Sequence, residues 1–132
     1  MSCYVSGDLA RYWEENMNAL GFWVPSTSYD ALGGISSMIA AVAAMVETNP
    51  GITLRAAFIK LGMTTFAASL AALTASAWVG AAIGSMAVAS GRSLACGATI
   101  ADALWIAREK FKIYGSWLEA EFLRNPQFLK GH

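Results

Sequence analysis

The pattern of hydrophobic and polar positions along the chain predicts a succession of helices. Two apolar stretches, 31–46 and 61–91, lie between the segments 6–20 and 93–123, in which apolar residues recur every three or four positions. Recurrence at that spacing is typical of amphipathic α-helices. We therefore predict an all-α domain over residues 1–132, a helical hairpin or bundle with two Ala/Gly-rich apolar helices flanked by amphipathic helices.

Each amphipathic segment has a recognisable apolar stripe. In 6–20, Trp13, Met17 and Leu20 follow helical spacing and Ser6 is a suitable N-cap, so the helix either anchors at a membrane interface or packs on the rest of the protein. The stripe of 93–123 comprises Ile100, Leu104, Ala107, Phe111, Tyr114, Leu118 and Phe122. We expect it to form one long helix, weakened at Gly115.

The stretch 61–91 contains no charged side chain, which raises the question of a membrane span. As one helix it would be about 46 Å long, beyond a bilayer core of about 30 Å, whereas 31–46 would cover about 24 Å. A long tilted helix and a hairpin bent near Gly80 and Gly84 both fit this length. The number and the orientation of spans stay open.

Small residues at four-residue spacing run along this stretch and form a predicted helix-packing ridge. Its members are Ala68, Ala72, Ser76, Gly80 and Gly84, and the last two form a GxxxG motif. A flat row of small side chains lets another helix approach closely, which is the usual way helices associate in lipid. The stretch 31–46 has two similar rows, Gly33, Ser37 and Ala41, and Ser36, Ala40 and Ala44.

Two interpretations of the apolar stretch remain side by side. Membrane insertion at some stage is favoured by its length and its lack of charge. An Ala-rich soluble bundle or close-packed oligomer is the alternative, because alanine, serine and threonine dilute the hydrophobicity that favours insertion. The sequence therefore describes a segment suited to either a buried or an inserted state.

Composition and charge limit the classes of partner that the protein is expected to bind. The chain is 56% hydrophobic and 14% charged, against about 25% charged in an ordinary globular domain. Its formal net charge is zero, so no nucleic acid is expected as a partner. Acids outnumber bases up to Glu47, and bases outnumber acids beyond it. No basic segment followed by an apolar one stands at the start, so we expect synthesis in the cytoplasm without a signal peptide.

Catalytic chemistry has little support in the sequence. The single histidine is His132 at the end of the chain, and Cys3 and Cys96 do not have the spacing of a metal or redox motif, so their disulfide state stays open. We expect no enzyme activity, no metal and no cofactor. Arg92 and Asp102 are the candidates for charges at a membrane interface or pore, although each also suits an ordinary position near a helix end.

The apolar segment "SLAALTASAWVGAAIGSMAVASG", flanked by amphipathic helices, resembles small bacterial pore-forming toxins with glycine-zipper segments. These include effectors delivered by type VI secretion, and the hydrophobic hairpins of pore-forming colicins are similar. The resemblance lies in composition and spacing over residues 31–107. It implies a soluble or carrier-protected form, insertion into the membrane of a target bacterium, and dissipation of ion gradients through association along the ridge.

The leading functional hypothesis is thus a pore-forming bacterial toxin or effector, secreted and acting at a membrane. Its expected partners are a lipid bilayer, further copies of itself, and a carrier, chaperone or immunity protein. A self-assembling structural protein, forming a filament or shell, is the second hypothesis. A small resident membrane protein, such as an immunity or holin-like protein, is the third.

Overall fold

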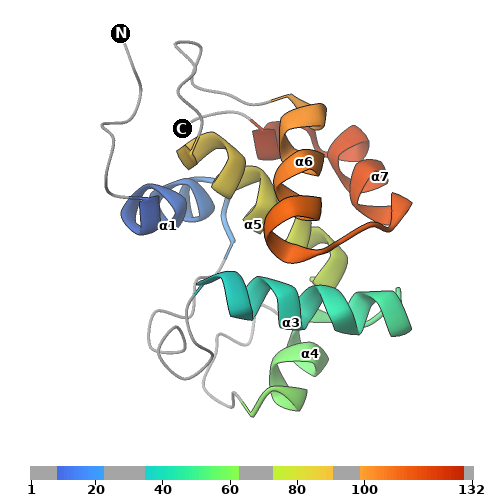
Figure 1. Ribbon diagram of the computed structural model, residues 1–132. Helices are drawn as coiled ribbons and strands as arrows, with labels where there is room; N and C mark the ends of the chain where they lie inside the picture. Colours follow the sequence, from blue (N-terminus) through green and yellow to red (C-terminus); the bar gives the residue numbers. More distant parts are fainter. Residues whose placement is uncertain (1–8, 23–34, 63–72, 91–98, 130–132) are drawn as a thin grey trace, which may run out of the picture.

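Helices account for the regular structure of the residues that can be described. The computed structural model describes residues 9–22, 35–62, 73–90 and 99–129. In chain order the helices are α1 (Leu9–Ala19), α3 (Ile35–Thr48), α4 (Leu54–Lys60), α5 (Ala75–Ser90), α6 (Ile100–Phe111), α7 (Ser116–Arg124) and the short 3-10 helix η2 (Pro126–Leu129) (Figure 1). Across these described ranges there is no strand, only an isolated bridge between Thr53 and Thr74. The all-α prediction is confirmed.

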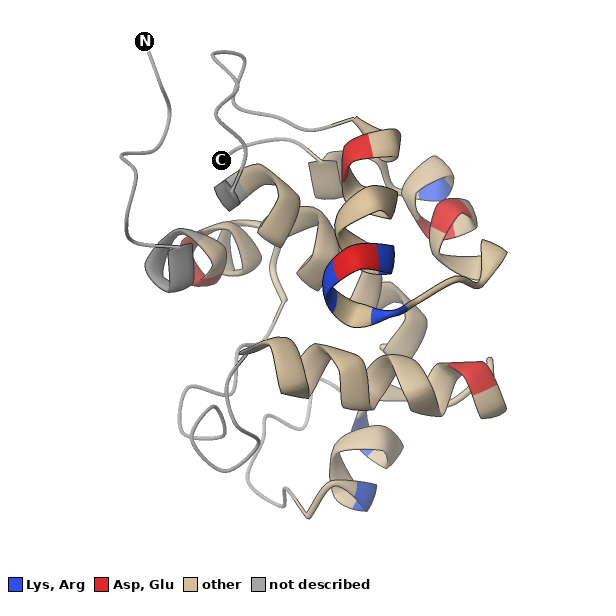
Figure 2. Ribbon diagram, in the orientation of Figure 1, with Lys and Arg blue, Asp and Glu red and all other residues tan. Residues whose placement is uncertain are grey.

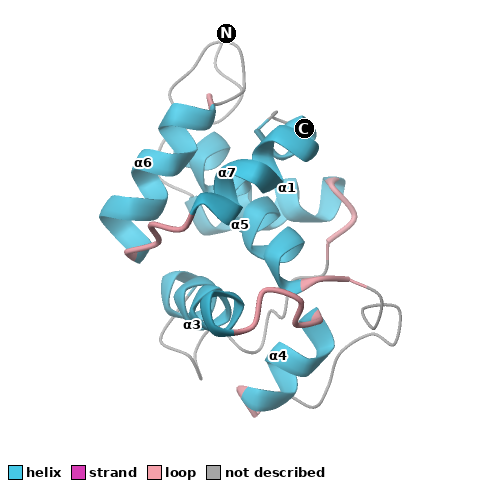
Figure 3. Cartoon of the chain, turned by 90° about the vertical axis from the view of Figure 1, so that its right-hand side faces the viewer, coloured by secondary structure: helices cyan, strands magenta, loops and turns pink. Residues whose placement is uncertain are grey.

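Helix α5 lies at the centre of the fold. It contacts all the other described helices, namely α1, α3, α4, α6, α7 and η2, and two views at right angles show them arranged around it (Figures 1 and 3). Every residue from Trp78 to Val88 is buried. A helix that is apolar on all sides is stable in water only when other elements cover it on all sides. The sequence of α5 has no charged side chain, so the surrounding helices provide that cover.

The predicted continuous helix over 61–91 is wrong. Helix α4 ends at Lys60, and Gly62 adopts the left-handed conformation, with φ of +85°. Thr74 starts α5 by accepting a hydrogen bond from the backbone N–H of Ala77 at 3.2 Å, as an N-cap does. Just before it, the N–H of Leu54 donates to the carbonyl of Leu73 at 2.8 Å, in an extended pairing that a helix cannot make. Length and apolarity alone did not reveal these two interruptions. Helix α5 continues through Gly80 and Gly84, so the alternative of a hairpin bent near these glycines is wrong as well.

The last amphipathic segment is also two helices. Lys112 takes a left-handed conformation, with φ of 57°, and ends α6, while Gly115 precedes α7. Ile113 between them is buried, whereas Tyr114 of the predicted stripe is 70% exposed. The stripe looked continuous because the turn returns Leu118 and Phe122 to the core, where both are fully buried. The predicted single helix over 93–123 is therefore wrong, although its periodicity did identify core residues.

Helices α1 and α3 each bury large apolar side chains in the core. Trp13 and Met17 of α1 are fully buried, so this helix packs on the protein. Helix α3 buries Met38, Ile39 and Val42, whereas Ser36 and Ala44 are exposed. Ser37 is exposed as well, so neither small-residue row of this stretch is buried as a whole.

The hairpin of two apolar helices is not confirmed, because α4 follows α3 before α5 begins. Among the described helices, none has the length and apolarity needed to cross a bilayer.

Candidate functional site

The predicted packing ridge can be followed on α5, where Ser76, Gly80 and Gly84 stand one turn apart. Four-residue spacing places them on one side of the helix. Ser76 is half-buried, and Gly80 and Gly84 are buried. Ala68 and Ala72, the other two members, lie outside the described residues. The described part of the ridge is therefore covered in this fold.

The cover is the end of the chain, formed by α7 and η2. A Cβ built on Gly80 would lie 3.2 Å from the Cβ of Glu121 and 3.3 Å from the ring of Phe128. At Gly84 the same construction places a Cβ 2.4 Å from the carbonyl oxygen of Phe128, a distance that real Cβ atoms do not adopt. Only glycine permits η2 to lie this close to α5. The GxxxG pair thus performs a close-packing role within one chain.

Glu121 is the buried charge at this contact, with 4% of its surface exposed. The hydroxyl of Ser76 donates to its Oε1 at 3.0 Å, and the amide of Asn125 donates to its Oε2 at 3.3 Å. Arg124, whose side chain is 67% exposed, forms a salt bridge with the same carboxylate. A buried carboxylate needs such partners because they replace lost hydration. Through Ser76, the carboxylate joins α7 directly to the ridge.

Two buried hydrogen bonds hold α1 on the other side of α5. The indole Nε1 of Trp13 donates to the carbonyl oxygen of Ala82 at 2.8 Å. The amide of Asn16 donates to the hydroxyl of Ser85, also at 2.8 Å. Because the donors are three residues apart in α1, as are the acceptors in α5, the two bonds set the register of this helix pair. The otherwise apolar contact therefore has a defined alignment.

Asp102 is part of the N-terminal cap of α6. Its backbone N–H donates to the Thr99 hydroxyl, and the Thr99 N–H donates to its carboxylate, both at 3.1 Å. This reciprocal pair is a capping box that starts α6. The backbone N–H and then the hydroxyl of Thr99 lower the pKa of Asp102 below its ordinary value. Arg92, the other candidate charge, lies outside the described residues.

The chemistry of this arrangement is helix packing. Among the residues that can be described, there is no group of three or more histidine, cysteine, aspartate or glutamate side chains placed to hold a metal ion. Sequence reasoning missed Glu121 and Phe128 as partners of the ridge. Glu121 directly precedes Phe122 of the apolar stripe and follows Leu118 by three residues, and both positions indicate that it borders the core.

Comparison with known proteins adds no relative. No protein-family model, curated protein or solved structure matches this chain. The functional argument therefore rests on the geometry around α5.

Proposed function

We propose that the protein inserts into membranes and makes them leaky, as a pore-forming bacterial effector does, and that the described fold shields its apolar helix from water. The observation that supports this is the composition and placement of α5. It carries no charged side chain, and its residues from Trp78 to Val88 are all buried beneath the other helices. A helix of this kind can exchange its protein cover for lipid without placing a charge in hydrocarbon.

The contacts made by α5 indicate how the described fold would convert to the membrane-inserted form. On one side α7 and η2 pack on Gly80 and Gly84, and on the other side Trp13 and Asn16 of α1 donate hydrogen bonds. Release of α7 and η2 would uncover the ridge. In lipid, where close packing replaces the hydrophobic effect, the uncovered ridge suits association with the same helix of a second copy. The membrane state in this proposal involves the whole apolar stretch 61–91 and a homo-oligomer.

The test is a reversible lock between α5 and α7. In a chain with Cys3→Ser and Cys96→Ser, the changes Gly80→Cys and Glu121→Cys place two cysteines across the ridge. A Cβ built on Gly80 lies 3.2 Å from the Cβ of Glu121, a few tenths of an ångström short of the usual disulfide range. A small shift therefore allows the bond to form, and far-UV circular dichroism verifies that both redox forms are folded.

We expect the oxidised form to leave dye-loaded anionic liposomes intact and the reduced form to release the dye. The cysteine-free parent, assayed with and without reductant, is the matched control and should release dye in both conditions. Equal release by the locked and the reduced forms would show that α5 need not leave α7. No release by the parent, with a large particle in light scattering, would replace the proposal with a structural assembly.

A further inference from the structure

The turn between α6 and α7 contains a residue that suits a helix better than a turn. Among the described residues, Lys112 is the only one other than glycine with a positive φ, at 57°. Its backbone N–H and that of Ile113 donate to the carbonyl of Ala107, in a helix end of the kind that glycine usually provides. Lysine is unfavourable in this left-handed conformation but favourable within a helix. The local preference of Lys112 therefore opposes the observed turn.

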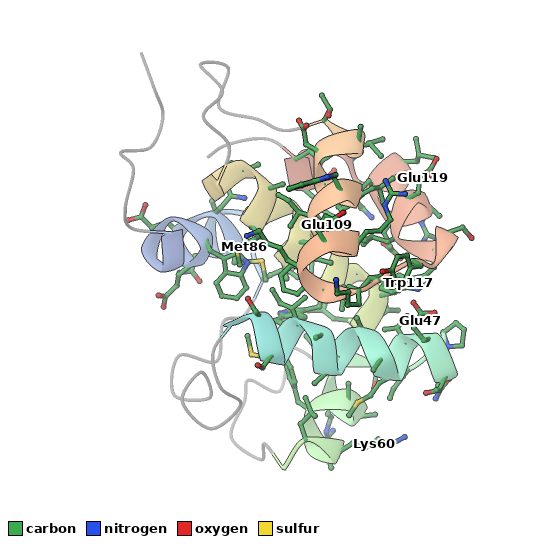
Figure 4. The ribbon with its side chains drawn as sticks, in the orientation of Figure 1. Glu47, Lys60, Met86, Glu109, Trp117 and Glu119 are labelled. Carbon is green, nitrogen blue, oxygen red and sulfur yellow. The ribbon has the colours of Figure 1, made fainter. Side chains whose placement is uncertain are left out.

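The start of α7 depends on contacts with another helix. Its N-cap is Gly115, which has no side chain to accept a backbone N–H. A Cβ built on Gly115 would overlap Cδ1 of Trp117 and lie 3.0 Å from Oε1 of Glu47. The indole nitrogen of Trp117 donates to this same Oε1 at 2.7 Å, and Figure 4 shows the two side chains next to one another. Packing of α7 against α3, rather than a side-chain cap, therefore fixes where α7 begins.

The apolar stripe continues through the turn without a change of spacing. Phe111, Tyr114 and Leu118 follow one another at three and four residues, as on one face of a single helix. In the described fold, however, Tyr114 is 70% exposed, whereas Phe111 and Leu118 are buried. Figure 2 shows charged residues gathered at the end of α6, where the connection to α7 leaves. A continuous helix from Ile100 to Arg124, about 37 Å long, would return Tyr114 to the face of its neighbours in the stripe.

The segment after the turn, α7 and η2, is called the arm below, and it contacts α5 more extensively than α6. Its backbone at Phe128 lies against Gly84, and its Glu121 accepts a hydrogen bond from Ser76 at 3.0 Å. Straightening of the turn would remove the arm from α5. Phe122 and Phe128, which are buried, would then lose their cover together with the ridge. A second copy of the chain has the same arm and the same ridge, so it can restore every one of these contacts.

We propose that two copies of the protein exchange their arms in water, so that the arm of each copy covers Gly80 and Gly84 of the other. Residues 112–115 become helical in this dimer and join α6 to α7. Lys112 thereby leaves the left-handed conformation, and Gly115 leaves its crowded position. The exchange is reciprocal, so the dimer is closed by a twofold axis. This inference goes beyond the proposed membrane function and does not rest on it.

A disulfide between two chains tests the exchange directly. In the Cys3→Ser/Cys96→Ser background, one chain carries Gly80→Cys and a second chain, with a size tag, carries Glu121→Cys. The two are unfolded in urea, refolded together at high concentration and oxidised. Because a Cβ built on Gly80 lies 3.2 Å from the Cβ of Glu121, we expect a disulfide-linked heterodimer. Leu123→Cys replaces Glu121→Cys in the control, since Leu123 is 65% exposed and reports random collisions.

Variants of the turn test the proposed role of residues 112–115 through the dimer dissociation constant, measured by light scattering. Lys112→Gly suits the turn and weakens the helix, so it should raise this constant by at least about tenfold for each of the two turns. Lys110→Gly, the same substitution within α6, should have little effect, because α6 is helical in both forms. Gly115→Ala should lower the constant. Its control is Gly51→Ala, because a Cβ built on Gly51 meets nothing within 4 Å.

Three results would overturn the exchange. The first is a heterodimer that is no more abundant with Glu121→Cys than with Leu123→Cys. The second is an equal response of the dissociation constant to Lys112→Gly and Lys110→Gly. The third is a wild-type protein that stays monomeric after refolding at high concentration. Circular dichroism verifies that each variant is folded, so that loss of the dimer reports on the arm.

Discussion

Gly84 shows how one residue decides the contact between two elements. Its missing side chain leaves room for the backbone of Phe128, since a Cβ on Gly84 would lie 2.4 Å from the carbonyl oxygen of Phe128. Gly80, one turn earlier, faces the side chains of Glu121 and Phe128, which can shift by a few tenths of an ångström. The two glycines of one GxxxG motif thus tolerate added volume differently, because one faces backbone and the other faces side chains.

The pair of variants Gly84→Ala and Gly80→Ala tests this difference. Both gain about 1 kcal/mol of helix propensity. Overpacking against backbone should cost Gly84→Ala about 1–3 kcal/mol, so we expect it to be at least ~1 kcal/mol less stable than Gly80→Ala. The free energy of unfolding is measured by urea denaturation. Equal stability of the two variants would mean that η2 does not lie against Gly84 in solution.

At the scale of elements, threonine side chains and short turns set where helices begin and end. Thr53 starts α4, Thr74 starts α5, and Thr99 starts α6, each by accepting a backbone N–H. Lys112, in the left-handed conformation, ends α6. These local signals divide stretches that hydropathy presents as continuous. The charge of Asp102 belongs to this scale, because it completes the capping box of α6.

The capping box predicts a pH effect on α6. The pKa of Asp102 is lowered in the folded protein by the N–H and hydroxyl of Thr99, so the stabilisation is present above the unfolded pKa and is lost as the pH falls through the folded pKa. Thr99→Ala should raise this pKa toward the ordinary value of aspartate and lower the stability by about 1 kcal/mol. Carbon-13 NMR titration of the carboxyl group follows the change. Thr99→Ser retains the hydroxyl and should keep the low pKa, and a raised pKa in that variant would contradict the mechanism.

At the scale of the whole molecule, the fold is a set of helices around one buried helix. Because α1, α3, α4, α6, α7 and η2 all contact α5, removal of any one of them exposes part of an uncharged helix to water. Stability in water is therefore shared among elements that are far apart in the sequence. In the proposed function, a lipid bilayer would take the place of these covering helices.

This arrangement predicts a single cooperative unfolding transition in water. Trp13 and Trp78 report on the buried centre by fluorescence, while far-UV circular dichroism reports on all helices. We expect the two signals to follow the same urea curve, as in a two-state protein. In the presence of anionic vesicles, fluorescence should change while helix content is retained. Separate transitions in water alone would show that part of the cover leaves α5 independently.

The periodicity of the sequence predicted much of the fold. The all-α class and the burial of Leu118 and Phe122 in α7 follow from apolar residues at helical spacing. The same spacing identified the apolar face of α1, and the tertiary structure places Trp13 and Met17 of that face in the core. The ridge was predicted as a packing surface, and Gly80 and Gly84 do permit close approach. Its expected partner, a second helix in lipid, stays a prediction.

The sequence by itself determined where apolar side chains recur at helical spacing and which positions are small enough for close approach, because hydrophobicity and side-chain size belong to each residue. Only the tertiary structure decided what covers them. Glu121 and Phe128 follow Gly80 and Gly84 by more than thirty residues in the sequence. They reach the two glycines because the turn at Lys112 returns α7 and η2 to α5. The exposure of Tyr114 was decided in the same way, by the turn that separates α6 from α7. Spacing along a chain describes a helix face, but the face gains its partner only when distant segments meet.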